Sequence, residues 1–94
     1  MKKYELMIIL KPLLPEDIRG GVQKKIEKLI TKGSGKVTGT DVWGKKHLAY
    51  PINKHDEGYY IVYKLEMEAS FAVEFQKELN LMSDILRSLL SVLD

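Results

Sequence analysis

The 94-residue sequence contains no cysteine, and this absence excludes several kinds of chemistry at once. A chain without thiols forms no disulfide, uses no cysteine nucleophile and binds no metal through cysteine. The sequence also lacks the run of about 18 apolar residues that a membrane-spanning helix requires. Its first residues lead directly into an aromatic and apolar segment. We therefore expect neither a secretory signal nor a transit peptide, and we expect a cytoplasmic protein.

Histidine and arginine are scarce too, which limits the scope for catalysis. His47 and His55 are the only imidazoles, the groups that most readily exchange protons near neutral pH. Neither has an acidic residue at a spacing typical of a catalytic pair, and His55 is most simply interpreted as a solvated loop residue. A metal site would need ligands converging from elsewhere in the chain, and no pattern indicates any. The sequence therefore predicts no enzyme activity, no metal and no cofactor.

Composition and charge indicate a small globular domain with an uneven surface. Hydrophobic residues make up 45% of the chain and charged residues 30%, and at this length residues 1–94 are expected to form one domain. The net charge is +2, but residues 1–64 carry 13 basic against 7 acidic side chains, and residues 65–94 carry 2 against 6. This asymmetry favours one surface that meets an anionic partner, although lysines scattered in solvent would give the same count.

The first third of the chain predicts a strand followed by a helix. Residues 4–10 are apolar on both faces, which is typical of a central strand. Pro15 and the acidic pair after it predict the start of a helix, which should end at Gly33. Gly20 and Gly21 fall inside this helix and should weaken it by about 1 kcal/mol each relative to alanine. Close packing of the helix on a sheet would explain them.

The middle of the chain predicts a hairpin and a second helix. Residues 36–43 and 59–66 have strand character, and the polar segment 53–58 between them predicts a turn. Ser70 is a good candidate for the N-cap of the helix that follows, in which apolar residues from Ala72 to Leu79 recur at helical spacing.

Residues 85–93 are ambiguous between helix and strand. Leu86, Leu89, Leu90 and Leu93 recur at helical spacing, and leucine itself favours a helix. Local evidence alone therefore favours a third helix. A fourth strand here would instead pair with a sheet edge that three strands leave open.

Residues 44–53 form the most informative segment of the chain. A basic cluster runs directly into an apolar stretch, and an aromatic residue follows three positions later. This composition suits a phosphate backbone better than a catalytic centre. In order, the residues are Gly44, Lys45, Lys46, His47, Leu48, Ala49, Tyr50, Pro51, Ile52 and Asn53.

This segment closely resembles the signature of the bacterial small-subunit ribosomal protein six family. The signature runs glycine, any residue, a basic residue, a polar residue, leucine, a small residue, tyrosine, any residue and isoleucine, and every position is met. Residues 3–5 and 58–60 and Arg87 also resemble the family, so the likeness covers nearly the whole chain.

The resemblance implies a specific fold. Residues 85–93 become a fourth strand, and the strand that begins at residue 36 continues to about residue 52. The order strand, helix, strand, strand, helix, strand is that of the ferredoxin-like split βαββαβ sandwich, an α+β fold. We therefore expect a four-stranded antiparallel sheet with two helices on one face.

The resemblance also implies a function. Family members are non-catalytic components of the small ribosomal subunit that bind the central domain of small-subunit ribosomal RNA. They do so as a heterodimer with small-subunit ribosomal protein eighteen. Arg87 is the favoured RNA contact, because a guanidinium can fork onto phosphate or stack on a base. The full set of predicted RNA-binding residues is Lys2, Lys3, Tyr4, Lys45, Lys46, His47 and Arg87. The predicted partner-binding residues, on the sheet face opposite the helices, are Met7, Ile9 and Val62.

Other functions remain open at this point. The leading alternative is a ferredoxin-like protein–protein interaction or regulatory module without RNA binding. The RNA-recognition-motif family uses a similar sheet, but this chain lacks its basic–glycine–phenylalanine motif. An enzyme is the weakest alternative.

Overall fold

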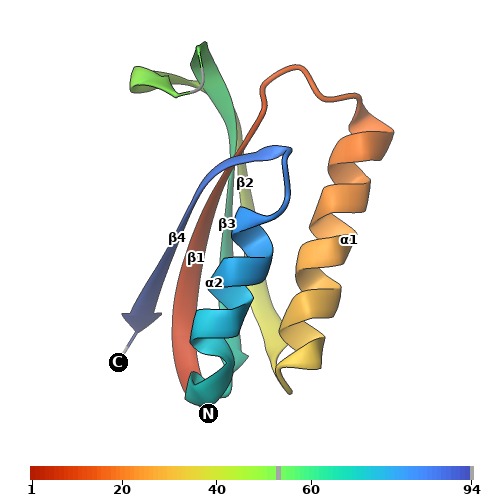
Figure 1. Ribbon diagram of the computed structural model, residues 1–94, viewed down its shortest axis with the longest axis vertical. Helices are drawn as coiled ribbons and strands as arrows, with labels where there is room; N and C mark the ends of the chain where they lie inside the picture. Colours follow the sequence, from red (N-terminus) through yellow and green to blue (C-terminus); the bar gives the residue numbers. More distant parts are fainter. Residues whose placement is uncertain (53, 94) are drawn as a thin grey trace.

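Two helices cover one face of a four-stranded antiparallel sheet in the computed structural model, which describes residues 1–52 and 54–93 (Figure 1). The sheet order confirms the ferredoxin-like split βαββαβ arrangement. No helix in the described ranges is long and apolar enough to cross a membrane. Along the chain the elements are β1 (Lys2–Leu10), α1 (Glu16–Lys32), β2 (Lys36–Ile52), β3 (His55–Met67), a short 3₁₀ helix (Ala69–Phe71), α2 (Ala72–Asn80) and β4 (Ile85–Leu93), with the strands in the order β2-β3-β1-β4.

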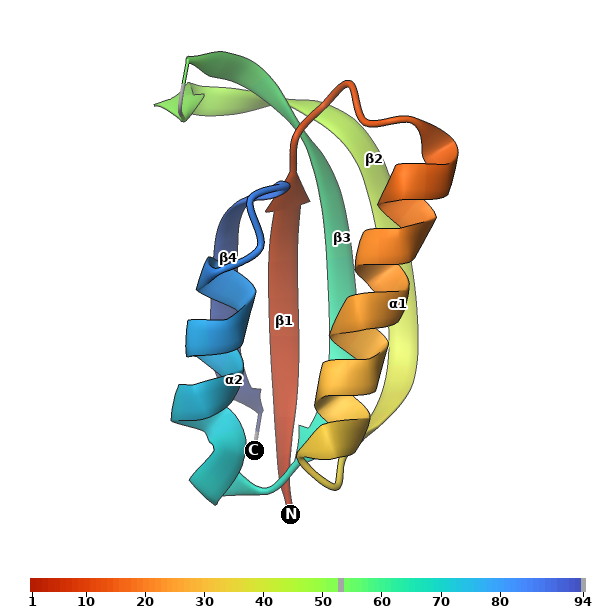
Figure 2. The same cartoon turned by 45° about the vertical axis from the view of Figure 1, so that its right-hand side comes forward.

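Strand β1 occupies the centre of the sheet, as the sequence predicts. It pairs antiparallel with β3 on one side and with β4 on the other (Figure 2). Alternate side chains such as Leu6 and Ile8 point towards the helices and are fully buried. Ile9, on the opposite face, is also buried. Residues on both faces of β1 are therefore buried, which explains why both faces are apolar.

The hydrophobic core lies between the sheet and the two helices. Both helices contribute one apolar stripe at helical spacing, and β1 and β3 contribute alternate residues. The core includes Leu6, Ile8, Leu10, Val22, Ile26, Leu29, Ile30, Ile61, Tyr63, Leu65, Met67, Phe75 and Leu79.

Residues 85–93 form strand β4, as the family resemblance implies and contrary to their helical spacing. Backbone pairs with β1 run from Ile85, opposite Leu10, to Leu93, opposite Lys3. Without β4 the central strand would expose a row of unpaired N–H and C=O groups. The need to satisfy that edge outweighs the helix propensity of leucine, which is a weaker preference.

The predicted N-cap at Ser70 is wrong. Ser70 lies within the 3₁₀ helix, and α2 begins after Phe71 without any side-chain capping bond. Phe71 instead donates its backbone N–H to the carbonyl of Glu68 at 3.0 Å, and its ring lies 6.4 Å from that of Phe75. Packing of these aromatic rings therefore accompanies the start of α2 where a capping serine was expected.

The β2–β3 hairpin is longer than the sequence indicates. Its return strand begins at His55 rather than at residue 59, and Ile52 pairs with His55. Lys54 has a positive φ of 68°, which suits a tight turn. Asn53, the first residue of the predicted turn, lies outside the described residues.

Close packing does not explain the glycine pair in α1. A Cβ built on Gly20 or Gly21 would have no heavy atom within 4 Å. At Gly35, by contrast, it would lie 2.3 Å from the carbonyl oxygen of Glu66. The packing interpretation of Gly20 and Gly21 is therefore wrong.

Replacing the helical glycines with alanine should stabilise the protein. Because both sites have open space, Gly20→Ala and Gly21→Ala should each raise the free energy of unfolding by about 1 kcal/mol. Urea denaturation measures this directly. Gly35→Ala serves as the control and should destabilise. A loss of stability in the first two variants would contradict the assignment of open space.

Tyr63 makes the stability of the fold depend on pH. Its side chain is fully buried, and its hydroxyl has no hydrogen-bond partner among the described residues. Burial raises the pKa of Tyr63 from 10.0 to about 12, and the negative charge of Glu27 adds to the rise. The folded state therefore disfavours the phenolate form more strongly than the unfolded state does.

Unfolding at alkaline pH should reveal the contribution of the raised Tyr63 pKa to stability. The contribution is fully present below the unfolded pKa of about 10 and is lost as pH rises through about 12. It amounts to about 2–3 kcal/mol. Tyr63→Phe removes the titrating group, so its unfolding free energy should fall less steeply over this pH range than that of the wild type. Parallel declines for the two proteins in urea titrations would contradict the prediction.

Candidate nucleic-acid interface

The far end of the β2–β3 hairpin bends over the end of the sheet (Figures 1 and 2). We refer to residues 44–52 and 54–58 as the hairpin arm. Gly44 stands at its base with a φ of +81°, at a shift in the register between β2 and β3. On the returning strand, near the same base, a Cβ on Gly58 would lie 2.3 Å from Cγ2 of Ile9. Two glycines therefore permit the bend and the close approach to β1.

The predicted basic cluster lies exposed on this arm. Lys45, Lys46 and His47 all present their side chains to solvent, and exposed Lys54 adds a cation at the turn. Lys54 is not among the predicted RNA-binding residues, although its place in the predicted turn indicates an exposed cation. Positive charge is therefore concentrated on the β2 side of the arm, whereas the β3 side carries Asp56 and Glu57, the latter paired with His47.

An aromatic platform adjoins the basic cluster. The rings of Trp43 and Tyr60 stack with centroids 6.1 Å apart and an interplanar angle of 14°. Nζ of Lys46 lies 5.2 Å from the Trp43 ring, and the indole N–H donates to Oδ2 of Asp41 at 2.9 Å. Trp43 remains 43% exposed. A cation beside an exposed aromatic pair is a suitable arrangement for phosphate and base contact.

Arg87 reaches the hairpin arm from β4. Its Nη1 donates a hydrogen bond to the hydroxyl of Tyr50, and its Cζ lies 5.3 Å from the centroid of the Tyr50 ring. These residues are 37 positions apart in the sequence. The sequence analysis singled out both but did not pair them, because only the bend of the arm brings Tyr50 across the sheet.

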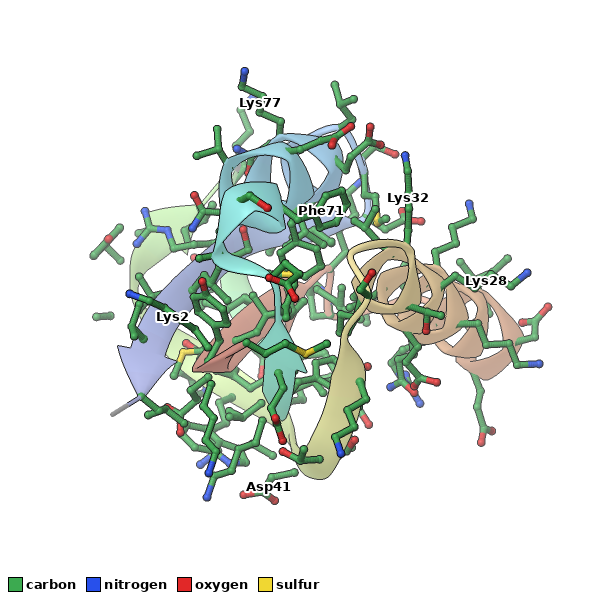
Figure 3. All side chains as sticks on the ribbon, turned by 90° about the horizontal axis from the view of Figure 1, so that it is seen from below. Lys2, Lys28, Lys32, Asp41, Phe71 and Lys77 are labelled. Atoms are coloured by element: carbon green, nitrogen blue, oxygen red, sulfur yellow. The ribbon has the colours of Figure 1, made fainter. Side chains whose placement is uncertain are left out.

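Lys2 and Lys3 lie at the opposite end of β1. Lys3 pairs with Glu66 and Leu93, whereas Ile9 pairs with Tyr60 and Arg87. Lys3 and Ile9 lie six residues apart along β1, which corresponds to about 20 Å. The structure does not bring Lys2 and Lys3 together with the hairpin arm. In the view from below, Lys2 lies on the side of the molecule away from α1 (Figure 3).

Tyr4 is not a surface residue. Only 3% of it is exposed, because its side chain faces the helices and belongs to the core. Its position on β1, alternating in phase with Leu6, determines this orientation. Burial argues against the predicted RNA contact, and Tyr4 belongs neither to the hairpin arm nor to the open face of the sheet.

The predicted partner residues share the sheet face opposite the helices. Met7 pairs with Val62 on one side and with Leu89 on the other. Met7 is half-buried, whereas Ile9 and Val62 are buried, so the exposed apolar surface of this face comes mainly from Leu89 and Trp43. The sequence analysis did not select these two residues for partner contact.

This face also contains a shallow hollow beside the aromatic platform. Its volume is about 340 Å³, and Glu5, Asp41, Val62 and Lys64 line it together with Trp43. A hollow of this size can accept side chains of a partner protein. No group of three or more potential metal ligands occurs within residues 1–52 and 54–93.

Comparison with known proteins establishes the family. The family model described as ribosomal protein S6 matches residues 3–91. The chain belongs to the ribosomal protein S6 family. It is therefore a structural, non-enzymatic protein of the small ribosomal subunit, located with the ribosome in the cytoplasm, as the signature at residues 44–52 predicts.

Individual relatives agree with this assignment. The small ribosomal subunit protein bS6 of Corynebacterium aurimucosum is 47% identical over 88 residues, which cover 94% of this chain and 92% of the relative. The protein of the same description from Moorella thermoacetica is 34% identical over 94 residues, covering 100% and 96%. A crystal structure of 30S ribosomal protein S6 from Thermotoga maritima superposes with a TM-score of 0.91 at 26% identity, covering 98% of this chain and 87% of that one.

The bend of the hairpin arm should depend on Gly58. Gly58→Ala forces a methyl group against Ile9 and should lower the free energy of unfolding by about 1–3 kcal/mol. Gly39→Ala is the matched control, because its Cβ would meet only Cβ of Lys64, at 3.8 Å. Thermal or urea unfolding of both variants provides the measurement. Equal stability of the two variants would contradict the close approach.

Proposed function

We propose that this protein binds the central domain of small-subunit ribosomal RNA as a heterodimer with small-subunit ribosomal protein eighteen. The observation that carries the proposal is the hairpin arm, on which Lys45, Lys46 and His47 are exposed and Lys46 lies beside the Trp43–Tyr60 platform. Membership of the ribosomal protein S6 family supports the same assignment.

The hairpin arm supplies the electrostatic part of binding. Lysine side chains neutralise phosphates and release the counterions condensed on the RNA, so affinity falls as salt rises. Such contacts position the protein without reading the base sequence. The exposed part of the Trp43 ring can contact an unpaired base, and aromatic contacts of this kind are the usual way in which proteins engage single-stranded RNA elements.

Lys2 and Lys3 provide a second, separate contact in this proposal. They lie at the other end of β1 from the arm, so one RNA segment would have to run along the sheet, or two segments would have to meet the protein. Folded RNA offers several backbone segments at such spacings. Both lysines are exposed and extend the basic surface beyond the arm.

The open face of the sheet is the proposed site for the protein partner. Leu89 is 59% exposed beside half-buried Met7, and the hollow next to Trp43 and Val62 lies on the same face. Exposed apolar surface of this kind is typical of protein interaction sites. The hairpin arm covers Ile9, so in this proposal Ile9 packs beneath the arm and does not contact the partner.

Binding to a central-domain RNA fragment tests the proposal. Titrations are made with and without the partner protein at two salt concentrations. We expect tight, salt-sensitive binding that requires the partner. The double variant Lys45→Ala/Lys46→Ala should bind about tenfold or more weakly, and the slope of log affinity against log salt should become shallower by about two.

The matched control changes the same charge on another surface. Lys24→Ala/Lys28→Ala removes two exposed lysines from α1, which project away from the sheet, as Figure 3 shows for Lys28. This variant should bind RNA like the wild type. Equal losses in both double variants would indicate nonspecific attraction. Absence of RNA binding with a demonstrably active partner would favour a protein interaction module instead.

A further inference from the structure

Backbone pairing alone does not hold the outer part of the hairpin arm in place. The ladder between β2 and β3 is interrupted between His47 and Ile52, so residues 48–51 lack regular partners on β3. Side-chain contacts must therefore hold this segment against the sheet. Leu48 of the arm and Ile9 of β1 face the same small hollow, which is one place where the arm meets the sheet.

The contact between Tyr50 and Arg87 is different in kind, because it ties the arm to the far strand of the sheet. In the strand order, β1 lies between β3 and β4. Tyr60, Ile9 and Arg87 form one row across these three strands. The arm crosses this row, and the hydrogen bond from Arg87 to Tyr50 closes it on the β4 side.

The space beneath the arm is a packing feature. It forms a hollow of about 120 Å³ lined by Ile9, Leu48, Ala49 and Ile52, among others. Ligand pockets usually measure about 300–1,000 Å³, so this hollow is too small for an organic molecule. Its apolar lining gives the arm a surface on which to rest.

We propose that Tyr50 and Arg87 form a clasp that fixes the hairpin arm over the sheet, and that Arg87 supports RNA binding as a positioning residue acting through Tyr50. This inference rests on the proposed RNA-binding function. Arg87 was the favoured direct RNA contact on sequence grounds, but its guanidinium is already engaged by the Tyr50 hydroxyl and ring. The residues that the clasp would position are Lys45, Lys46 and His47.

The physical advantage of such a clasp is preorganisation. A mobile arm would lose conformational freedom when RNA binds, and that loss would reduce affinity. A clasped arm has already lost this freedom in the free protein. Tyr50→Phe removes the hydroxyl without altering any charge, so it separates the positioning role from direct neutralisation of phosphate.

Hydrogen exchange on the free protein tests the clasp without RNA. Tyr50→Phe and Arg87→Ala should both speed amide exchange within the hairpin arm and leave β1 and α1 unchanged. Ser91→Ala, which removes an exposed hydroxyl from β4 opposite Glu5, is the control and should leave the arm as protected as in the wild type. Unchanged exchange in both clasp variants would overturn the proposal, whatever the RNA measurements show.

Binding of the same variants to the central-domain RNA fragment, with the partner present, tests the positioning role. Tyr50→Phe should weaken binding by about threefold to tenfold with an unchanged salt slope. The double variant Tyr50→Phe/Arg87→Ala should be no weaker than Arg87→Ala alone, because both act through one contact.

The alternative outcomes are distinct. Wild-type affinity for Tyr50→Phe, together with a weaker Arg87→Ala whose salt slope is shallower by about one, would make Arg87 a direct phosphate contact and overturn the positioning role. Losses that simply add in the double variant would do the same. Failure of the wild type to bind RNA would instead reject the proposed function, while the exchange measurement would still decide whether the clasp exists.

Discussion

Pairing of β1 along both of its edges is the constraint on which the rest of the structure depends. The strand connects β3 to β4, and its buried side chains Leu6 and Ile8 belong to the core that both helices share. Pairing on both edges supplies backbone hydrogen-bond partners along most of the central strand. Because β4 must complete this pairing, a leucine-rich segment with helical spacing becomes a strand. The same pairing places Arg87 of β4 beside Ile9 of β1, and thus within reach of the arm.

The interface combines a rigid sheet with a bent extension of two of its strands. The sheet supplies the apolar open face with Met7, Val62 and Leu89, whereas the hairpin arm supplies the lysines. Gly44 permits the bend, and Gly58 permits the close approach to Ile9. Charge and apolar surface are therefore concentrated on different parts of one molecule, which suits simultaneous contact with a polyanion and a protein. The position of the arm relative to the sheet determines how these two surfaces meet their partners.

Three expectations from the sequence differ from the structure for a common physical reason. Ser70 matched a capping preference, but aromatic packing of Phe71 at the start of α2 replaced it. Tyr4 matched the family's opening, but its place in the strand alternation buries it under the helices. The glycine pair in α1 suggested close packing where the structure has open space. In each case residues far away in the chain determine the surroundings of the position, and a local sequence pattern does not contain them.

Local sequence patterns were enough to predict β1, β3 and both helices, and to assign the family. The alternation in β1 and β3, the apolar stripes of α1 and α2, and the signature at residues 44–52 are local patterns with local physical causes. Tertiary structure decided what these patterns become in space. It turned residues 85–93 into an edge strand, bent the hairpin arm over the sheet and brought Tyr50 to Arg87. These outcomes depend on contacts between distant residues, and such contacts exist only once the sheet order β2-β3-β1-β4 has been established.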